Sequence, residues 1–448
     1  MFDKILIANR GEIAVRVVRT CQELGVPTVA VYSSRDEQSS AVRLANESVR
    51  IGPPQAKHSY LNAMAVVEAA MRTGADAIHP GYGFLSEDPD FADVCAANGI
   101  TMIGPPADVM AVLGGKITAR ALMRDAGLPL LPGGTDALDA DAAAELAGRI
   151  GFPVIVKASA GGGGRGMSVV RDAESFPAAY ARTEATAQVL FGDHRVYVER
   201  YLDSARHVEV QVLCDGHGNA VHLGTRDCTV QRRHQKLLEE SPAPDLPAGL
   251  ADRMGRAALD GALAAGYVGA GTFEFLVAPD GEFYFMEVNC RIQVEHPVTE
   301  MVTGIDLVAE QIRVASGEPL RLRQEDVRQD GVSIECRINA EDPDRDFLPT
   351  PGPVAEFVPA GGPGVRVDTH VFTGYEIPPD YDSLLAKLVV WAADRQGAIS
   401  RMRRALAEFR VSGPRLRTTR GFLADVLGQP RFVTATHDTS LVERMLTA

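Results

Sequence analysis

Short apolar runs and helix-like patterns alternate along the first quarter of the chain. Residues 4–8 (KILIA) form an apolar run, after which Ile13, Val17 and Leu24 recur at the spacing of one helix face. The alternation continues with strand patterns at 28–32, 77–78 and 101–103 and helix patterns at about 61–72 and 91–97. Strands that alternate with helices pack into a parallel sheet covered by helices. The pattern therefore predicts a doubly wound α/β domain over residues 1–114.

The hydrophobic pattern from residue 107 to 126 is that of one long helix, and it leads into a second unit at residues 115–203. Here two β-rich runs, 153–157 and 167–170, flank a segment composed mainly of glycine. Glycines let a loop approach phosphate groups and present backbone N–H groups, and Lys157 at the edge adds charge. The spacing does not match the G-x-x-x-x-G-K-[ST] loop. A flexible linker is the alternative, but the position between two strands favours a hinged lid over a nucleotide.

Residues 271–296 (GTFEFLVAPDGEFYFMEVNCRIQVEH) carry the strongest chemical pattern. Asp280-Gly281 favours a two-residue hairpin turn, which would place Glu274 directly opposite Glu287. Facing carboxylates repel each other, so the pair predicts a cation between them. Oxygen ligands beside substrate phosphates suit Mg²⁺. A half-buried strand with a solvated polar face is the alternative.

Polar and apolar residues alternate after this pair. If the backbone stays extended, the polar side chains project together from one side. The polar row would contain Glu287, Asn289, Arg291, Gln293 and Glu295, and the apolar row Val288, Cys290, Ile292 and Val294. Solvated strand faces favour Thr, Lys and Ser, whereas this row mixes metal-ligand, anion-binding and general-base types. We therefore predict an active site in this third unit, residues 204–330.

The last unit, residues 331–448, mixes short strands with helices. A strand at 333–339 (SIECRIN) points Glu335, Arg337 and Asn339 the same way. Short strands rich in Gly, Pro and Val follow, then a strand and an amphipathic helix, and the final residues give no clear pattern. The predicted fold class is thus a multidomain α/β and α+β protein. It has an N-terminal doubly wound α/β domain, a central lid and a C-terminal mixed α+β domain.

Composition and charge narrow the partners. The chain has 448 residues, enough for several subdomains, and its 46% hydrophobic and 23% charged content is that of a soluble globular protein. The net charge of −14 argues against nucleic acid or an anionic membrane as the main partner. Any phosphate site must therefore be a local basic cluster. The densest such cluster comprises Arg232, Arg233, His234 and Lys236.

Cysteine usage and the absence of targeting patterns bear on location. The six cysteines lack a C-x-x-C pair and zinc-site spacing, which indicates reduced thiols. The first residues enter a strand pattern without a signal sequence, and no apolar run is long enough to span a bilayer. We therefore expect a cytoplasmic protein with no membrane partner.

Two segments at predicted strand ends are further candidates. HPGYGFLSE, residues 79–87, follows a strand where open α/β sheets place ligand sites, and a structural loop is an equal alternative. Residues 199–202 leave another strand and could bind an adenine edge, although an ordinary strand end explains them as well. The first strand is not followed by G-x-G-x-x-G, which argues against a nicotinamide cofactor.

Six segments together resemble a known family. They are KILIANRGEIAVR, HPGYGFLSE, KASAGGGGRGM, QRRHQK, EVNCRIQVEHPVTE and ECRINAEDP. In this order, over essentially the whole chain, they are similar to the biotin carboxylase subunit of bacterial acetyl-CoA carboxylase, in the ATP-grasp, biotin-dependent carboxylase family. The resemblance implies an ATP-grasp lid within residues 115–203, an ATP-grasp catalytic core at 204–330 and a C-terminal biotin carboxylase domain. Cys290 and Arg200 depart from the family's common Thr and Lys, at positions without a matched catalytic role.

The resemblance also implies roles for individual residues. The nucleotide-binding positions are Lys116, Lys157, Gly162, Gly163, Gly164, Met167, Glu199, Leu202, His207, Gln231 and His234. The metal positions are Glu274, Glu287 and Asn289. The bicarbonate pocket comprises Lys236, Arg291, Gln293 and Val294, with Glu295 as general base and Arg337 as the residue that steadies biotin.

The activity that the resemblance implies is the ATP- and bicarbonate-dependent carboxylation of biotin at N1′ through carboxyphosphate, with Mg²⁺ or Mn²⁺. This is the first half-reaction of acetyl-CoA or another acyl-CoA carboxylase. No A-M-K-M biotin-attachment sequence occurs, so we expect biotin on a separate biotin carboxyl carrier protein, separate carboxyltransferase subunits and a homodimer. The alternatives are another ATP-grasp ligase that joins a carboxylate to an amine, and a non-catalytic nucleotide-binding regulatory subunit.

Overall fold

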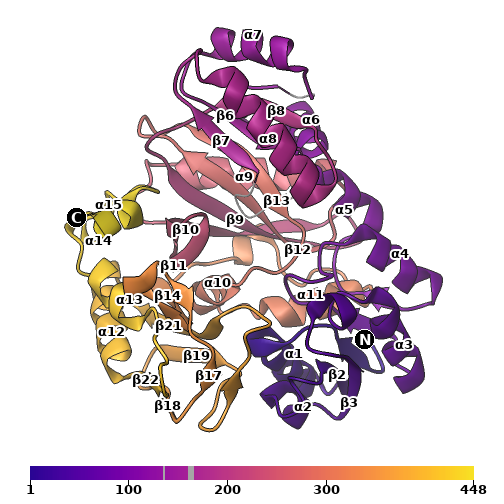
Figure 1. Ribbon diagram of the computed structural model, residues 1–448. Coiled ribbons are helices and arrows are strands. Elements are labelled where there is room, and N and C mark those ends of the chain that lie inside the picture. The colour runs from indigo at the N-terminus through magenta and orange to yellow at the C-terminus, as the bar shows by residue number, and fades with distance from the viewer. Residues whose placement is uncertain (135–136, 160–165, 448) are drawn as a thin grey trace.

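The computed structural model describes residues 1–134, 137–159 and 166–447. Its first region is a five-stranded parallel sheet in the order β3-β2-β1-β4-β5, with helices packed on it, at the lower right of Figure 1. This confirms the predicted doubly wound α/β domain. The strands are β1 (Ile5–Ile7), β2 (Thr28–Ser33), β3 (Glu47–Gly52), β4 (Ala77–His79) and β5 (Thr101–Met102). The helices are α1 (Gly11–Leu24), α2 (Ser40–Leu44), α3 (Ala63–Thr73) and α4 (Pro89–Ala97), with a short 3-10 helix, η1 (Ala56–His58).

The predicted long helix between the first two units is wrong. Two helices are present, α5 (Ala107–Gly114) and α6 (Lys116–Asp125). Gly115 between them is extended, with φ −83° and ψ 114°, so the helical hydrogen bonding stops there. The backbone N–H of Lys116 bonds the Ser159 carbonyl at 3.3 Å, which places Lys116 at the edge of the second unit.

The second unit is a lid with its own small core. An antiparallel sheet in the order β7-β6-β8 packs against two helices, and in Figure 1 this layer lies above the large sheet. Its elements are α7 (Ala140–Ile150), β6 (Val154–Ala158), β7 (Met167–Val170), α8 (Phe176–Phe191) and β8 (Val196–Arg200). Val156, Phe176 and Val198 are among the buried residues that hold the layer together. Gly162, Gly163 and Gly164 lie outside the described residues.

The centre of the molecule is an eight-stranded antiparallel sheet in the order β13-β12-β9-β10-β11-β14-β21-β19. Its strands are β9 (Arg206–Cys214), β10 (Ala220–Arg232), β11 (Gln235–Ser241), β12 (Gly269–Val277), β13 (Phe283–Asn289), β14 (Val332–Asn339), β19 (Val365–Thr369) and β21 (Leu384–Ala392). Helices α9 (Leu250–Ala264), α10 (His296–Thr303) and α11 (Leu307–Ala315) pack against it. The sheet joins strands from before and after residue 330, and the four predicted domain boundaries stay a prediction.

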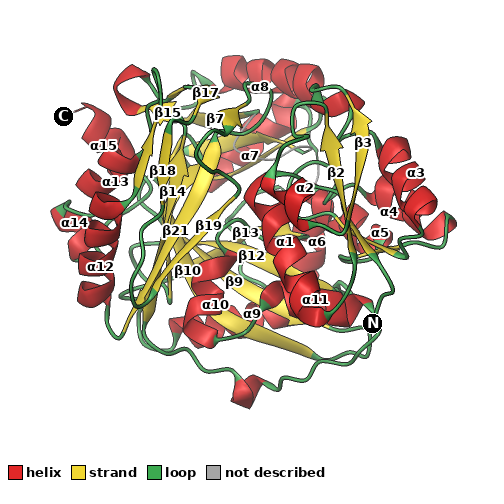
Figure 2. Ribbon diagram, turned by 90° about the horizontal axis from the view of Figure 1, so that it is seen from below, coloured by secondary structure: helices red, strands yellow, loops and turns green. Residues whose placement is uncertain are grey.

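The remaining chain completes the C-terminal region. Helix α12 packs on β21 and β14, and Figure 2 shows it with α13 to α15 on the outer side of these strands. The helices are α12 (Arg395–Glu408), α13 (Arg420–Val426), α14 (Pro430–Val433) and α15 (Leu441–Thr447), with η2 (Gln324–Asp326) and η3 (Pro343–Arg345). The short strands are β15 (Glu341–Asp342), β16 (Leu348–Pro349), β17 (Gly352–Pro353), β18 (Glu356–Val358), β20 (Glu376–Ile377) and β22 (Arg410–Ser412). None of the described helices is long and apolar enough to cross a membrane.

The turn between β12 and β13 differs from the prediction, yet the predicted carboxylate pair forms. The N–H of Ala278 bonds the Glu282 carbonyl at 2.8 Å, so the loop has a third residue, with Gly281 in the left-handed region at φ 85°. This three-residue loop shifts the strand register by one. A β-bulge between the pairs of Glu274 and Phe275 shifts it back. Glu274 therefore lies opposite Glu287 after all.

Candidate active site

One cavity of about 1180 Å³ lies where the lid, the eight-stranded sheet and the N-terminal loops meet. It is the larger of the two best-formed cavities in the described part of the chain. Every predicted site residue in the described ranges lines it, with Glu295 as the exception. These lining residues are Lys116, Lys157, Met167, Glu199, Leu202, His207, Gln231, His234, Lys236, Glu274, Glu287, Asn289, Arg291, Gln293, Val294 and Arg337.

Glu295 lies directly beneath the cavity rather than in its wall. Its side chain is fully buried, and its two oxygens accept hydrogen bonds from Lys236 Nζ at 2.6 Å and Arg337 Nη2 at 2.9 Å. Burial opposes ionisation, but the two cations hold the pKa of Glu295 well below its ordinary value. Glu295 is therefore an ionised carboxylate coupled to two side chains that reach the cavity.

Lys236 is the centre of the charged floor. Its ammonium group donates to Glu209 at 2.7 Å, to Glu274 at 2.9 Å and to Glu295. Lysine has three donors, and all three are used. Although burial disfavours the charged form, the surrounding acidic groups raise the pKa of Lys236 well above its ordinary value. Lys236 is thus a fixed positive charge.

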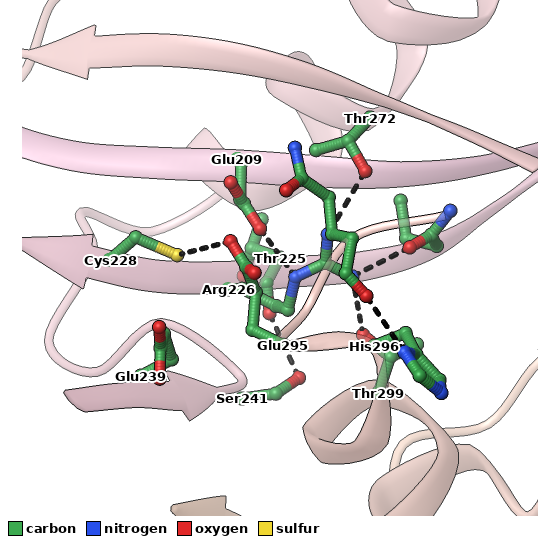
Figure 3. A network of polar contacts seen from close by, with 12 residues as sticks. Glu209, Thr225, Arg226, Cys228, Glu239, Ser241, Thr272, Glu295, His296 and Thr299 are labelled. Carbon is green, nitrogen blue, oxygen red and sulfur yellow. Dashed lines mark hydrogen bonds and ion pairs between the residues drawn. The ribbon is translucent and has the colours of Figure 1, made fainter. Parts of the chain in front are cut away.

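A local network supports this floor from below. Figure 3 shows the fully buried Arg226 guanidinium at the centre of hydrogen bonds to Glu209, Thr272 and Thr299. Cys228 Sγ lies 3.8 Å from Glu295 in the same network. Apart from Glu295, none of these residues was assigned a role from the sequence. Charged residues inside strands that are otherwise buried are the signal that could have found them.

The facing carboxylates Glu274 and Glu287 are in different electrostatic states. Burial opposes ionisation of Glu274, but Lys236 and His207, whose Nε2 lies 2.9 Å from Glu274 Oε2, hold the pKa of Glu274 low. Burial and the facing Glu274 charge raise the pKa of Glu287. Glu287 lines the cavity and, within the described residues, its side chain makes no hydrogen bond. The raised pKa of Glu287 records excess negative charge that a cation would relieve.

These donors fit a hard divalent cation. Two carboxylates and the amide oxygen of Asn289 are the ligand types that Mg²⁺ prefers. Asn289 Nδ2 donates to Glu274 Oε1 at 2.8 Å, and Asn289 Oδ1 accepts from Arg291 Nη2 at 3.1 Å. The amide is therefore held beside Glu274 by contacts on both its ends.

The predicted extended row after Glu287 is partly wrong. Strand β13 ends at Asn289, and residues 290–295 are an irregular segment that leads into α10. The expected separation of side chains still holds for Arg291 and Gln293, which line the cavity while Cys290 and Ile292 are buried. Val294, expected on the apolar side, also reaches the cavity wall. The alternation is therefore kept from Cys290 to Gln293 without strand pairing and is lost at Val294.

The lid side of the cavity is basic. Burial lowers the pKa of Lys116, as does the neighbouring Lys157 charge, and burial and Lys157 likewise lower the pKa of His234. The Glu199 carboxylate pairs with Lys157 and, at 2.7 Å, with Arg120. Two lysine side chains, Lys116 and Lys157, that share one confined space favour a polyanion such as a nucleotide phosphate chain.

The predicted basic cluster divides at a hairpin that the sequence analysis did not foresee. Strands β10 and β11 are joined by Arg233 and His234, both with positive φ (48° and 68°). Lys236 reaches the floor of the cavity, whereas Arg232 and Arg233 pair with Asp346. The C-terminal helix α15, which was not predicted from the sequence, also contributes to the cavity wall through Val442.

Comparison with known proteins agrees with this geometry. Three family models match in order: the biotin carboxylase N-terminal domain over residues 1–110, the ATP binding domain of the carbamoyl-phosphate synthase L chain over 115–323, and the biotin carboxylase C-terminal domain over 335–444. The chain is 52% identical to the biotin carboxylase of Nostoc sp. over 445 residues, 99% of each chain. It is 51% identical to biotin carboxylase 1 of Bacillus subtilis, covering 99% of this chain and 98% of that one.

Two solved structures share the fold over nearly the whole chain. The crystal structure of a Campylobacter jejuni biotin carboxylase–βγ-ATP complex superposes with a TM-score of 0.96 at 46% identity, covering 99% of both chains. The biotin carboxylase domain dimer of Hydrogenobacter thermophilus 2-oxoglutarate carboxylase, in complex with MgADP, ADP and bicarbonate, gives 0.95 at 45% identity, covering 99% of this chain and 98% of that one. This chain therefore belongs to the biotin carboxylase family of ATP-dependent ligases and has its ATP-grasp architecture.

Proposed function

We propose that this protein carboxylates biotin at N1′, using ATP and bicarbonate. One observation carries the proposal: Lys236 and Arg337 reach into the cavity while both are bound to the same buried carboxylate, Glu295. A base flanked by two fixed cations suits an anion that must lose a proton and then an enolate that must be stabilised. The facing pair Glu274 and Glu287 stands in the same cavity. A carboxylate–amine ligase has no need of the group formed by Lys236, Arg337 and Glu295.

The basic side of the cavity is the proposed nucleotide site. Lys116 and Lys157 would contact the phosphates, with Gly162, Gly163 and Gly164 closing above them. Adenine contacts are assigned to Glu199 and Leu202, and further nucleotide contacts to Met167, His207, Gln231 and His234. The bound nucleotides in the Campylobacter and Hydrogenobacter structures support this assignment.

Glu274, Glu287 and Asn289 would hold Mg²⁺ or Mn²⁺. When bound, the ion would neutralise charge on the β- and γ-phosphates. The residues assigned to bicarbonate and biotin act directly on those substrates. Because burial and Glu274 raise the pKa of Glu287, this end of the cavity is where compensating positive charge is most needed.

The first chemical step joins bicarbonate to phosphate. Lys236, Arg291, Gln293 and the backbone of Val294 position bicarbonate, and Glu295 takes its proton. A bicarbonate oxygen then attacks the γ-phosphorus, the bond to the bridging oxygen breaks, and ADP leaves with carboxyphosphate formed. Positioning and charge stabilisation account for most of this step.

The second step transfers the carboxyl group. Carboxyphosphate breaks down to CO₂ and phosphate, and the phosphate takes the N1′ proton of biotin. The resulting ureido enolate, stabilised by the Arg337 guanidinium, attacks CO₂ to give N1′-carboxybiotin. Arg337 is held for this role by Glu295 and by Glu239, which accepts from Arg337 Nε at 2.6 Å.

The proposed partners follow from the same chemistry. The biotin would be attached to a separate biotin carboxyl carrier protein, with carboxyltransferase subunits that use the product and a homodimer like that of the Hydrogenobacter domain. A cytoplasmic location is supported by the six free, buried cysteines.

The test measures ATP cleavage by the purified chain with free biotin and bicarbonate, omitting each in turn. Cleavage should depend on both, and mass spectrometry should detect carboxybiotin. Cleavage that requires an amine and a carboxylate but neither biotin nor bicarbonate would support the alternative ligase. ATP binding without any turnover would support the regulatory subunit.

A further inference from the structure

The irregular segment 290–295 carries much of the proposed bicarbonate pocket, but no strand pairing holds it. Its ends are instead held by side chains from other regions. Glu87 accepts the Cys290 N–H at 2.9 Å with one oxygen and Arg291 Nε at 2.9 Å with the other. At the far end, the buried Lys387 ammonium donates to the Val294 carbonyl at 2.9 Å. The segment is thus positioned by two side chains from distant parts of the chain, Glu87 from the N-terminal region and Lys387 from β21.

The position of Glu87 is itself fixed. The residue ends the HPGYGFLSE segment, whose turns are closed by hydrogen bonds from Ser86 N to the Gly83 carbonyl and from Asp88 N to the Leu85 carbonyl. Asp88 then caps helix α4 by accepting the Phe91 N–H at 3.2 Å. A carboxylate placed directly before a capped helix has little backbone freedom. The HPGYGFLSE segment therefore holds Glu87 in place, a role separate from nucleotide binding and metal binding.

We infer that Glu87 is a positioning residue for bicarbonate, acting through Arg291; the inference rests on the proposed function. Glu87 lies behind Arg291 and is not among the residues that line the cavity in the described ranges. Its carboxylate offers a separate oxygen to each of two donors, whereas an amide would place an NH₂ group, which cannot accept, at one of these two positions. Glu87 thereby fixes the position of the Arg291 guanidinium relative to the backbone at Cys290.

The charges around Arg291 determine where its guanidinium moves when Glu87 is lost. Glu87, Glu295 and Glu274 all attract this guanidinium, and Glu87 is the strongest of the three. Without Glu87, the remaining attraction points toward the cavity floor. The guanidinium would then turn to Glu274 and Glu295 and occupy the space that bicarbonate needs. Loss of Glu87 should therefore weaken bicarbonate binding without affecting the nucleotide end.

Kinetics of Glu87→Ala and Glu87→Gln test the inference. The KM for bicarbonate should rise about tenfold or more in Glu87→Ala, since small displacements of a positioning group have effects of this size, and by less in Glu87→Gln. The KM for MgATP should stay within about twofold of the parent value. Glu282→Gln is the control, because Glu282 is also an exposed partner of an arginine, Arg253, and neither residue lines the cavity. This control should leave both constants unchanged.

Two further measurements separate positioning from a general structural effect. The double variant Glu87→Ala, Arg291→Ala should have the bicarbonate KM of Arg291→Ala alone, and a crystal structure of Glu87→Ala should show the guanidinium turned toward the cavity floor. Equal changes in both KM values, or an additive double variant, would overturn the inference. So would an unmoved guanidinium, a result that does not depend on activity. Absence of biotin-dependent turnover in the parent would instead refute the proposed function alone.

Discussion

The eight-stranded sheet contains two pairs of glutamates, and within each pair the side chains lie opposite each other on neighbouring strands. The electrostatic repulsion within the two pairs is relieved in different ways. Glu274 lies opposite Glu287 on β12 and β13, and Glu239 lies opposite Glu335 on β11 and β14. Like charges directly across strands are destabilising, so each pair must be compensated. The comparison shows that the compensation is decided by what surrounds the pair rather than by the pair itself.

The first pair opens onto the cavity and is surrounded by cations. Lys236 and His207 contact Glu274, and the Lys116 and Lys157 charges act on Glu287. There is room beside the carboxylates for an ion and a phosphate chain. This pair is suited to binding a metal.

The second pair is closed off. Glu239 Oε1 accepts from Arg337, but Glu239 Oε2 and both oxygens of Glu335 are buried without a hydrogen-bond partner among the described residues. Burial raises the pKa of Glu335 well above its ordinary value, and the facing Glu239 charge raises it further. A proton on Glu335, rather than a metal, would relieve this repulsion. Paired carboxylates therefore indicate excess charge, and access from the cavity determines whether a cation binds.

The largest effect should come from removing the charge of the first pair. Glu274→Gln combined with Glu287→Gln should lower biotin-dependent ATP cleavage by roughly a thousandfold or more, since two stabilisers of the transferred phosphoryl group are lost. The measurement is turnover across a Mg²⁺ titration. Activity equal to that of the parent at limiting Mg²⁺ would contradict the metal assignment.

A smaller loss is expected at Arg337, which binds Glu239 of the second pair and the buried Glu295. Arg337→Ala removes the cation that bridges Glu239 and Glu295, and the carboxylation rate should fall by about a few hundredfold, or roughly 3 to 4 kcal/mol in the barrier. ATP affinity, measured by calorimetry, should be largely kept because the nucleotide end is untouched. Parental rates on free biotin would show that Arg337 does not stabilise the enolate.

The sequence predicted the first pair and not the second, for a physical reason. Glu274 and Glu287 belong to one hairpin, so local turn chemistry indicates their pairing. Even there the predicted turn was one residue short, and a bulge that leaves no sequence signal restored the register. Glu239 and Glu335 meet only because β11 pairs with β14, a contact between distant segments that depends on the whole sheet.

The other parts of the fold also differ in how well local sequence predicts them. The alternating pattern of the N-terminal domain predicted its strands and helices because parallel strands are buried on both faces. The hairpin turn at Arg233 and His234 was missed, since neither residue is the glycine that positive φ usually requires. The roles of Arg226 and Glu87 were missed because each acts through residues far away in the chain.

The smallest expected effect is on how the free energy of unfolding depends on pH. It tests most directly whether the two glutamate pairs differ in protonation. The folded protein keeps a proton on Glu335 that the unfolded chain releases above the ordinary value of 4.5. The free energy of unfolding should therefore fall as pH rises from about 4.5 until the raised pKa is passed, by up to about 1.4 kcal/mol per pH unit. Glu335→Gln carries no such proton and loses this slope. Relative to the parent, it should become more stable between pH 6 and pH 8.

Chemical denaturation of both proteins at pH 6, 7 and 8 measures this difference. The groups that act on Glu335 are Lys387, Glu239, Arg337 and Glu295, and all remain in the variant. Burial raises the pKa of Glu239 to about 7, so the change reports the facing pair of Glu239 and Glu335. Glu376→Gln, at an exposed position, is the control and should keep the parental slope. A difference between Glu335→Gln and the parent that does not vary with pH would mean that Glu335 is ionised in the folded state. The second pair would then have to be compensated by Lys387 and Arg337 alone, and the contrast between the two pairs would disappear.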